Sequence, residues 1–142
     1  MDGYDLSRFV SAQKQDFEKA LSEIRAGRKR SHWMWYVFPQ LKGLGRSGMS
    51  EYYGIEGLGE ARAYLANGSL ASNLRSVCEA LLENGGSDAE EILGRPDDMK
   101  LRSSMTLFLI ASGGDPLFRR VLERFFGGET DPLTLRILDK DR

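Results

Sequence analysis

The sequence is divided into segments in which apolar residues recur every three or four positions, and each segment ends at glycine, asparagine–glycine or proline. The clearest segment, 117–126, places its apolar residues on one helical face: Leu117, Phe118, Val121, Leu122, Phe125 and Phe126. No segment alternates apolar and polar residues over more than a few positions, as a half-buried strand would. The pattern therefore predicts an all-α protein.

The length and the stop signals predict one compact domain, residues 1–142, with about six to eight helices. We expect helices over about 5–26, 31–37, 59–66, 70–83, 87–94 and 98–111, and two more that begin where Asp115 precedes Pro116 and where Asp131 precedes Pro132. Pro39 should end the second helix. The helix over 98–111 should be the most buried, since its last third is apolar on all sides.

The sequence also predicts one helix cap and one ordered loop. Ser87 and Glu90 have the spacing of a capping box, in which each side chain satisfies a free backbone amide. The glycine-rich segment 41–59 is expected to be an ordered, functional loop, because Tyr52 and Tyr53 would otherwise be exposed to solvent.

Composition excludes several classes of function. The net charge of −1 argues against general nucleic-acid binding, which needs a basic face. A lone cysteine, Cys78, cannot form an internal disulfide, and its position predicts a buried, unreactive thiol in a cytoplasmic protein. We expect no signal peptide and no membrane span. One histidine and one cysteine, far apart in the sequence, provide no zinc-type ligand set, so we expect no metal site and no cofactor.

The first candidate binding element is the basic triplet Arg28, Lys29 and Arg30, followed by Ser31 as a possible helix N-cap. Three cations beside the positive end of a helix are unfavourable, and a bound anion would relieve the repulsion. The triplet therefore predicts a site for a phosphate or carboxylate. The alternative is a solvated basic surface with no ligand.

Aromatic residues follow the triplet directly. Trp33, Trp35 and Tyr36 could stack on a ring of a ligand, and His32 could act as a hydrogen-bond donor or a general acid–base group. The alternative is that Trp33 and Phe38 belong to the hydrophobic core, as large aromatic side chains often do.

The second candidate element is the start of the helix over 98–111. It carries cations and hydroxyls at helical spacing behind two acids that could cap it: Asp97, Asp98, Lys100, Arg102, Ser103 and Ser104. These residues could line a pocket, or they could only cap the helix and pair along it. Gly127 and Gly128 form a weaker third element, where the backbone could approach a ligand or simply end a helix.

Six segments together resemble the DUF1810 family, whose function is unknown: "DLSRFVSAQ", "GRKRSHWMWYVFPQLKGLGRS", "YYGI", "EARAYL", "DDMKLRSSMTLF" and "FFGGETDPLTL". The resemblance covers about residues 5–138. The family is in turn distantly similar to NADAR proteins, helical domains linked to ADP-ribose and N-glycosidic chemistry. That similarity implies a catalytic role for His32, but Ser31 stands where NADAR proteins have a glutamate. The missing carboxylate would come from Asp97 or Asp98, or from Glu51 or Asp131.

Two hypotheses follow. The first is an enzyme that binds a small phosphorylated nucleoside or ADP-ribosyl ligand and hydrolyses its N-glycosidic bond. The second is a non-catalytic module or adaptor that recognises a phosphate-bearing ligand. Both require the residues at 28–30 to meet Lys100 and Arg102 beside the indole rings once the chain has folded. The sequence carries no indication of the oligomeric state.

Overall fold

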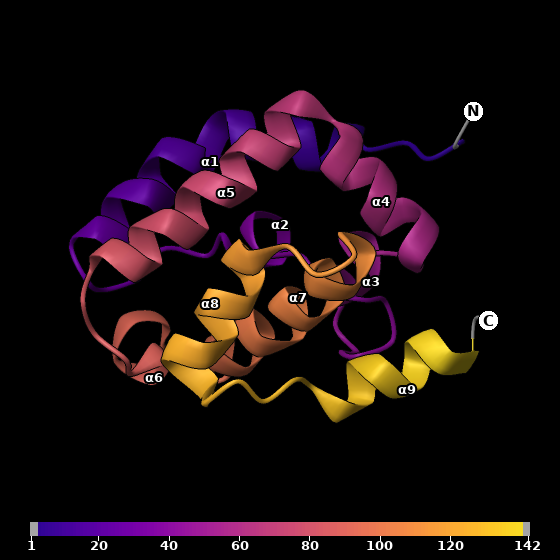
Figure 1. Ribbon diagram of the computed structural model, residues 1–142. Coiled ribbons are helices and arrows are strands. Elements are labelled where there is room, and N and C mark those ends of the chain that lie inside the picture. The colour runs from indigo at the N-terminus through magenta and orange to yellow at the C-terminus, as the bar shows by residue number, and fades with distance from the viewer. Residues whose placement is uncertain (1–2, 141–142) are drawn as a thin grey trace.

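The computed structural model describes residues 3–140, which form nine helices (Figure 1). These are α1 (Ser7–Arg25), α2 (Met34–Val37), α3 (Gly48–Tyr52), α4 (Leu58–Ala66), α5 (Gly68–Glu83), α6 (Ala89–Leu93), α7 (Asp97–Ala111), α8 (Pro116–Phe126) and α9 (Pro132–Lys140). No strand occurs over this range, so the all-α prediction is confirmed. The helix not expected from the sequence is α3, which lies inside the glycine-rich loop.

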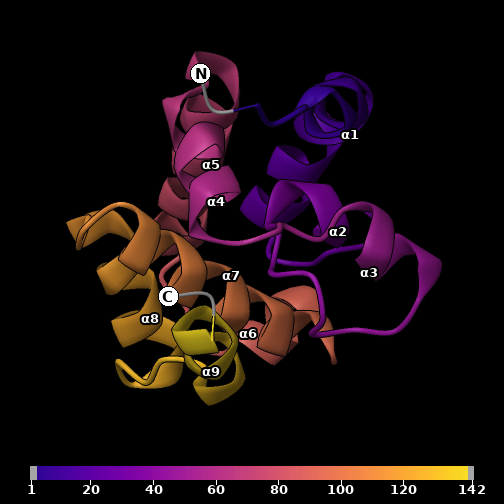
Figure 2. The same ribbon diagram turned by 90° about the vertical axis from the view of Figure 1, so that its right-hand side faces the viewer.

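The two longest helices, α1 and α5, lie side by side along one side of the molecule, and α7 runs through its centre (Figures 1 and 2). Helix α7 packs against α4, α6, α8 and α9. Nine of its residues are buried, more than in any other helix of residues 3–140. The expectation that this helix is the most buried is confirmed.

One hydrophobic core joins the helices, and aromatic rings connect its layers. The ring of Phe108 on α7 lies 5.1 Å from that of Tyr64 on α4 and 6.0 Å from that of Phe118 on α8. All three side chains are almost completely buried. Removing such a ring typically costs about 3–5 kcal/mol, so this column contributes strongly to the stability of the fold.

The helix starts predicted at the two aspartate–proline pairs, and the helix end predicted at Pro39, are correct. Asp115 accepts a hydrogen bond from the Leu117 amide, and Asp131 accepts one from the Thr134 amide, as expected for residues that precede Pro116 and Pro132. Pro39 follows the end of α2 as predicted. The structure therefore confirms these aspartate–proline starts and the proline stop.

Other caps were misplaced by the sequence pattern. Asp88, one residue after Ser87, caps α6 by accepting from two backbone amides, so the predicted capping box is wrong. Ser31 does not cap α2, whose N-cap is Trp33 and has no side-chain bond. Helix α7 has Pro96 as its N-cap, so neither of its first two aspartates caps it. At α6, the Asp88 carboxylate stands directly before the helix and takes the cap position in place of Ser87.

The segment between α2 and α4 is ordered, as predicted. Leu41 and Ile55 form an isolated parallel bridge, with hydrogen bonds from the Lys42 amide to the Ile55 carbonyl and from the Ile55 amide to Gln40. Ser47 caps α3. These bonds close the loop on itself, and Arg8 of α1 donates to the Gly54 carbonyl, which ties the loop to α1.

The two tyrosines of this segment have different environments. Tyr53 packs against the core, whereas Tyr52 has 60% of its surface exposed. The expectation that Tyr52 would avoid solvent is therefore wrong. Within residues 3–140, no helix combines the length and the apolar character that crossing a bilayer requires.

Candidate functional site

The basic triplet at 28–30 does not directly precede a helix, because α2 begins only at Met34, and the chain from Arg30 onwards binds a carboxylate of α1. The amides of Arg30 and Ser31 donate to Glu23 Oε1 at 2.7 and 3.0 Å. The Ser31 hydroxyl donates to Oε2 at 2.6 Å, and the Trp33 indole N–H donates to Oε1 at 2.9 Å. An anion-binding arrangement therefore exists where the sequence predicted one, but the protein's own glutamate occupies it.

These four bonds also control the ionisation of Glu23. Burial would raise the pKa of Glu23, but the hydrogen bonds from Ser31, Arg30 and Trp33 outweigh it and lower the pKa to about 2. Glu23 is therefore ionised throughout the physiological range. An external phosphate would have to displace this carboxylate before it could use the same amides.

The two predicted positive segments meet at one residue, Asp97. Lys29 Nζ lies 2.9 Å from Asp97 Oδ2, and Lys100 Nζ lies 3.1 Å from Oδ1. Lys29 also lies 5.2 Å from the centre of a Trp33 ring, and Lys100 lies 3.5 Å from that of Trp35. Both carboxylate oxygens of Asp97 are thus occupied by ammonium groups. The charges of Lys29, Lys100 and Asp97 are therefore paired within the protein, through two ion pairs and two cation–π contacts.

Other predicted residues lie apart from this cluster. Arg28 and Arg30 are exposed, and Arg28 lines a cavity of about 470 Å³ together with Lys29, Glu90 and Glu91, so two carboxylates balance the two cations of its wall. His32 is exposed, and its imidazole makes no hydrogen bond or ion pair within the described part of the chain. Asp98 is buried and accepts from the Met99 amide at 2.9 Å.

Arg102 and Ser103 hold the segment before α9. Arg102 donates to the carbonyls of Glu129 and Thr130, and the Ser103 hydroxyl donates to Asp131 Oδ2 at 2.9 Å. Positions 100 and 102 are about 200° apart around a helix, so Arg102 points away from Lys100. The structure brings Lys29 to Lys100 but not to Arg102.

The remaining predicted residues have structural environments. Trp33 has no exposed surface and Phe38 has 1%, which confirms the core alternative for both. Ser104 is fully buried, and its hydroxyl has no hydrogen-bond partner among residues 3–140. Gly127 and Gly128 adopt positive φ at the exposed end of α8 and act as its stop.

A cavity that contains only one predicted residue, Tyr36, lies between α1, α2 and α3. It encloses about 300 Å³, and we call it the tyrosine pocket. Its walls are formed by Ser7, Arg8, Ser11, Ala12, Gln15, Asp16, Tyr36, Tyr52 and Tyr53. Three phenol rings and one carboxylate therefore surround a space large enough for a nucleobase or a pentose.

The acid of the pocket is Asp16. The Tyr36 hydroxyl donates to Asp16 Oδ2 through a short hydrogen bond, and no described protein group binds Oδ1. Burial of Tyr36 and the adjacent Asp16 carboxylate raise the pKa of the phenol, so Tyr36 stays protonated and remains a donor at neutral pH. The Gln13 amide fixes the backbone of Tyr36 by donating to its carbonyl at 2.7 Å.

Arg8 forms the other polar wall. Its guanidinium donates to Glu60 Oε2 at 3.0 Å and to the Gly54 carbonyl at 3.1 Å, which joins α1 to the loop and α4. Its Nε is buried without a hydrogen-bond partner in the described residues. Tyr53 packs its ring 5.0 Å from that of Tyr36, so the aromatic wall is continuous.

Comparison with known proteins places this fold in a family. The family model described as "Protein of unknown function (DUF1810)" matches residues 3–138. The chain belongs to the DUF1810 family. Among solved structures, the crystal structure of the conserved hypothetical protein Rv1873 from Mycobacterium tuberculosis is 46% identical, with 96% of this chain and 97% of that chain covered and a TM-score of 0.93. A search of the curated proteins found no match.

Three of the segments that resemble DUF1810 proteins meet at the tyrosine pocket. The segment "DLSRFVSAQ" supplies Arg8 and its neighbours on α1, "YYGI" supplies Tyr52 and Tyr53, and the long aromatic segment supplies Tyr36. Asp16 was missed by the sequence reasoning. The available signal was the spacing of residues 8, 12 and 16, which places a cation, a small residue and an acid on one helical face.

Other chemistries find no support in the described residues of this DUF1810 protein. No group of three histidine, cysteine, aspartate or glutamate side chains is placed to hold a metal within residues 3–140. Cys78 is fully buried, and burial raises the pKa of its thiol. The prediction of a buried, unreactive thiol agrees with this environment.

Proposed function

We propose that the protein binds the nucleoside part of a phosphorylated nucleoside or ADP-ribosyl ligand in the tyrosine pocket and hydrolyses its N-glycosidic bond. The observation that carries the proposal is the pairing of Asp16 with Tyr36 on the wall of a pocket that Tyr52 and Tyr53 complete. Aromatic rings beside a carboxylate suit a base attached to a sugar that develops positive charge.

Asp16 would supply the carboxylate of the reaction. The bond between the anomeric carbon and the base nitrogen breaks, and its electrons leave with the base, which departs neutral from a pyridinium nucleotide and otherwise takes a proton from solvent. A water oxygen bonds to the anomeric carbon, and Asp16 Oδ1 takes the proton that the water releases. Tyr36 holds Oδ2 and so orients the carboxylate. Asp16 would thereby take the role of the NADAR glutamate, at whose position this chain has Ser31.

The phosphate end of the ligand would extend towards Arg8 and Lys42. Both residues line an adjoining cavity of about 380 Å³, which shares Ser7, Arg8 and Tyr52 with the tyrosine pocket. Lys42 pairs with Glu56 at 2.9 Å, and the two side chains have 39% and 61% of their surface exposed. An ion pair this exposed to solvent is weak, so a phosphate can exchange with Glu56 at small cost, while Asp5 and Glu60 on the same wall limit how tightly that phosphate is held.

A non-catalytic binding module is the second candidate. It is favoured by the separation of the predicted catalytic residues, because Asp97 is neutralised by two lysines and His32 does not line the tyrosine pocket. In that case the tyrosines bind the base and Asp16 accepts hydrogen bonds from ribose hydroxyls. The lone buried cysteine supports a cytoplasmic site of action for either candidate.

The decisive experiment measures release of base and reducing sugar by chromatography from nicotinamide mononucleotide, nucleoside monophosphates and ADP-ribosylated nucleotides. We expect Asp16→Asn to lower the rate by about 100-fold or more, since positioned general bases contribute roughly 10²–10⁴-fold. Tyr52→Ala should weaken binding by about 1–3 kcal/mol, the value of one stacked base. Asp139→Asn, at an exposed position of α9, is the matched control and should change neither quantity.

The outcomes separate the candidates. Turnover that depends on Asp16 supports the enzyme. Calorimetric binding without turnover, weakened by Tyr52→Ala, supports the binding module. Neither binding nor turnover with any of these compounds would refute both, provided that thermal melting shows that the variants are folded.

A further inference from the structure

A second cavity lies where α4, α5, the end of α7 and the start of α8 come together. It encloses about 400 Å³ and shares no residue with the tyrosine pocket. We call it the alanine cavity. Ligand sites in proteins usually begin at about 300 Å³, so this volume is sufficient for a small molecule.

The walls of the alanine cavity are mostly apolar. The apolar part is formed by Leu65, Ala66, Ala71, Ala111 and Phe118, and Ser112 adds a hydroxyl beside the charged residues described below. Phe118 belongs to the core and has 1% of its surface exposed, so packing fixes the position of its ring. The three alanines come from three different helices, and their short side chains create the hollow. Such a surface favours a ligand with an apolar body.

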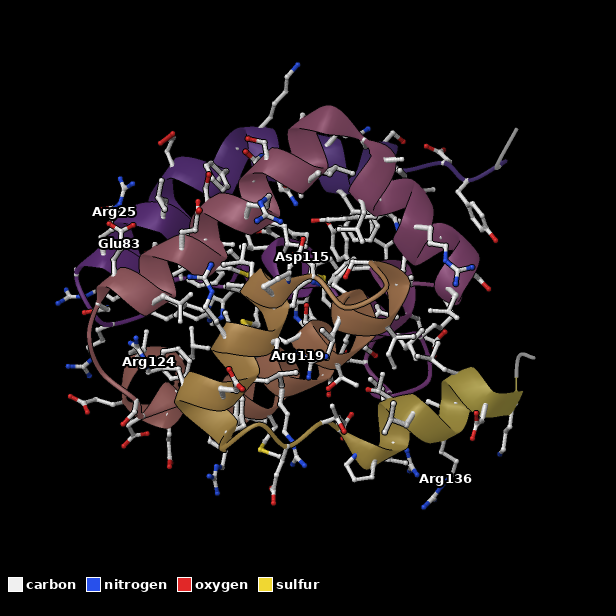
Figure 3. The ribbon with its side chains drawn as sticks, viewed as in Figure 1. Arg25, Glu83, Asp115, Arg119, Arg124 and Arg136 are labelled. Carbon is white, nitrogen blue, oxygen red and sulfur yellow. The ribbon has the colours of Figure 1, made fainter. Side chains whose placement is uncertain are left out.

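One of the two arginines of the cavity is already neutralised. Arg75 donates to Asp115 Oδ2 at 2.6 Å, and Oδ1 of the same carboxylate accepts from the Leu117 amide at 2.9 Å. Burial pushes the pKa of Asp115 upward, but the Leu117 amide and Arg75 outweigh it and hold the pKa below its ordinary value. Figure 3 labels Asp115 at the start of α8, where α8 approaches α5. This pair closes one end of the cavity.

The other arginine, Arg62 on α4, is not neutralised. It lines the cavity, its side chain is exposed, and it makes no ion pair or hydrogen bond within residues 3–140. With Arg75 and Asp115 compensating each other, the charge of Arg62 remains. An apolar hollow with one uncompensated cation at its rim suits a ligand of complementary charge.

We propose that the alanine cavity binds a small amphiphilic carboxylate, with its chain against Phe118 and the alanines and its carboxylate on Arg62. Guanidinium and carboxylate form paired, charge-assisted hydrogen bonds, which fix the orientation of the ligand. The site is independent of the tyrosine pocket, because the two cavities have different walls. The protein thus carries one site for a polar aromatic ligand and one for an apolar acid.

The test uses the full chain, labelled with ¹⁵N, and titrates it with butanoate, hexanoate, octanoate and 1-octanol. We expect octanoate to shift the amide signals of Ala66, Ala71 and Ala111, and not those of Tyr52 and Tyr53. Affinity should rise about fourfold with each added methylene, the value for burying one such group, until the cavity is filled. Octanoate should bind more tightly than octanol.

Three variants locate the binding groups. Arg62→Gln should weaken octanoate binding about tenfold and leave octanol binding unchanged. Arg119→Gln is the matched control. Arg119 is an exposed arginine of α8, one turn after Asp115 and labelled in Figure 3, and it does not line the cavity, so this variant should bind octanoate as the wild type does. Ala71→Leu should fill the cavity and abolish binding of both probes. Three results would each overturn the proposal: amide shifts that lie away from the three alanines, equal affinities for octanoate and octanol, or an unchanged octanoate affinity in Arg62→Gln. The last result involves an exposed side chain, so it does not depend on a substitution that could disturb the fold.

Discussion

The Glu23 carboxylate offers the sharpest test of the physical reasoning, through the variant Glu23→Gln. The variant keeps the size of the side chain but removes the charge that four donors share. It also turns an amide NH₂ group towards a site that contains only donors. We therefore expect the free energy of unfolding to fall at neutral pH.

The magnitude follows from the pKa. If folding lowers the pKa of Glu23 from an ordinary 4.5 to about 2, its ionised form favours the folded state by about 3 kcal/mol without screening. Glu23 is partly open to solvent, which screens such interactions, so we expect about half of that value, ~1.5 kcal/mol.

The sign of the pH dependence is fixed by the direction of this change. Because the pKa is lower in the folded state, the stabilisation is complete above about pH 4.5 and is lost as the pH falls towards about 2. The assay is urea unfolding followed by circular dichroism, at several values between pH 7 and pH 2.5. The difference between the wild type and Glu23→Gln should be largest at pH 7 and should approach zero at the acid end.

Subtracting the variant from the wild type removes the contributions of the other carboxyl groups. Glu18→Gln is the matched control, because Glu18 lies on the same helix, is exposed and makes no bond within residues 3–140. It should change stability by less than about 0.5 kcal/mol at every pH. A wild-type-minus-Glu23→Gln difference that does not change with pH would refute the assignment of Glu23 as the internal anion.

Two further predictions concern the interior. Cys78 should react with a thiol reagent only after the protein unfolds, because the side chain has no exposed surface and burial raises the pKa of its thiol. Labelling of the native protein on a time scale of seconds would contradict this prediction. Gly54→Ala should destabilise the fold by about 1–3 kcal/mol, since its Cβ would lie 2.7 Å from backbone atoms of the loop. Gly68→Ala, whose Cβ would meet nothing within 4 Å, is the control and should be neutral or slightly stabilising in the same thermal melts.

The helices could be predicted because their signals are local. Asp115 before Pro116 and Gly127 after Phe126 bound α8 within one segment of sequence, and both bounds are correct. The start of α6 was predicted less well, because Ser87 and Asp88 are both good caps and only the backbone conformation decides between them. Helix α3 was not predicted, since its five residues are held by the bonds that close the loop, which no local pattern shows.

The site was harder to predict because its residues come from separate parts of the chain. The aromatic segment was identified correctly as unusual, but the sequence does not show that Trp33 turns into the core while Tyr36 lines a pocket. Arg8 and Tyr52 are 44 residues apart in the sequence and share that pocket only because the loop folds back on α1. Such a convergence depends on tertiary packing, which helical periodicity does not contain.

Two carboxylates on α1 show how a structural acid differs from one that is available to a ligand. Asp16 and Glu23 are two helical turns apart, and both bind the segment that contains Trp33 and Tyr36. Glu23 has four donors and lines none of the cavities described above, so the donors around its charge all come from the protein itself. Asp16 has one donor, an oxygen without a described partner and an open pocket beside it. A ligand that donates hydrogen bonds therefore gains most at Asp16, whereas an external anion at the basic triplet would first have to break the bonds of Glu23.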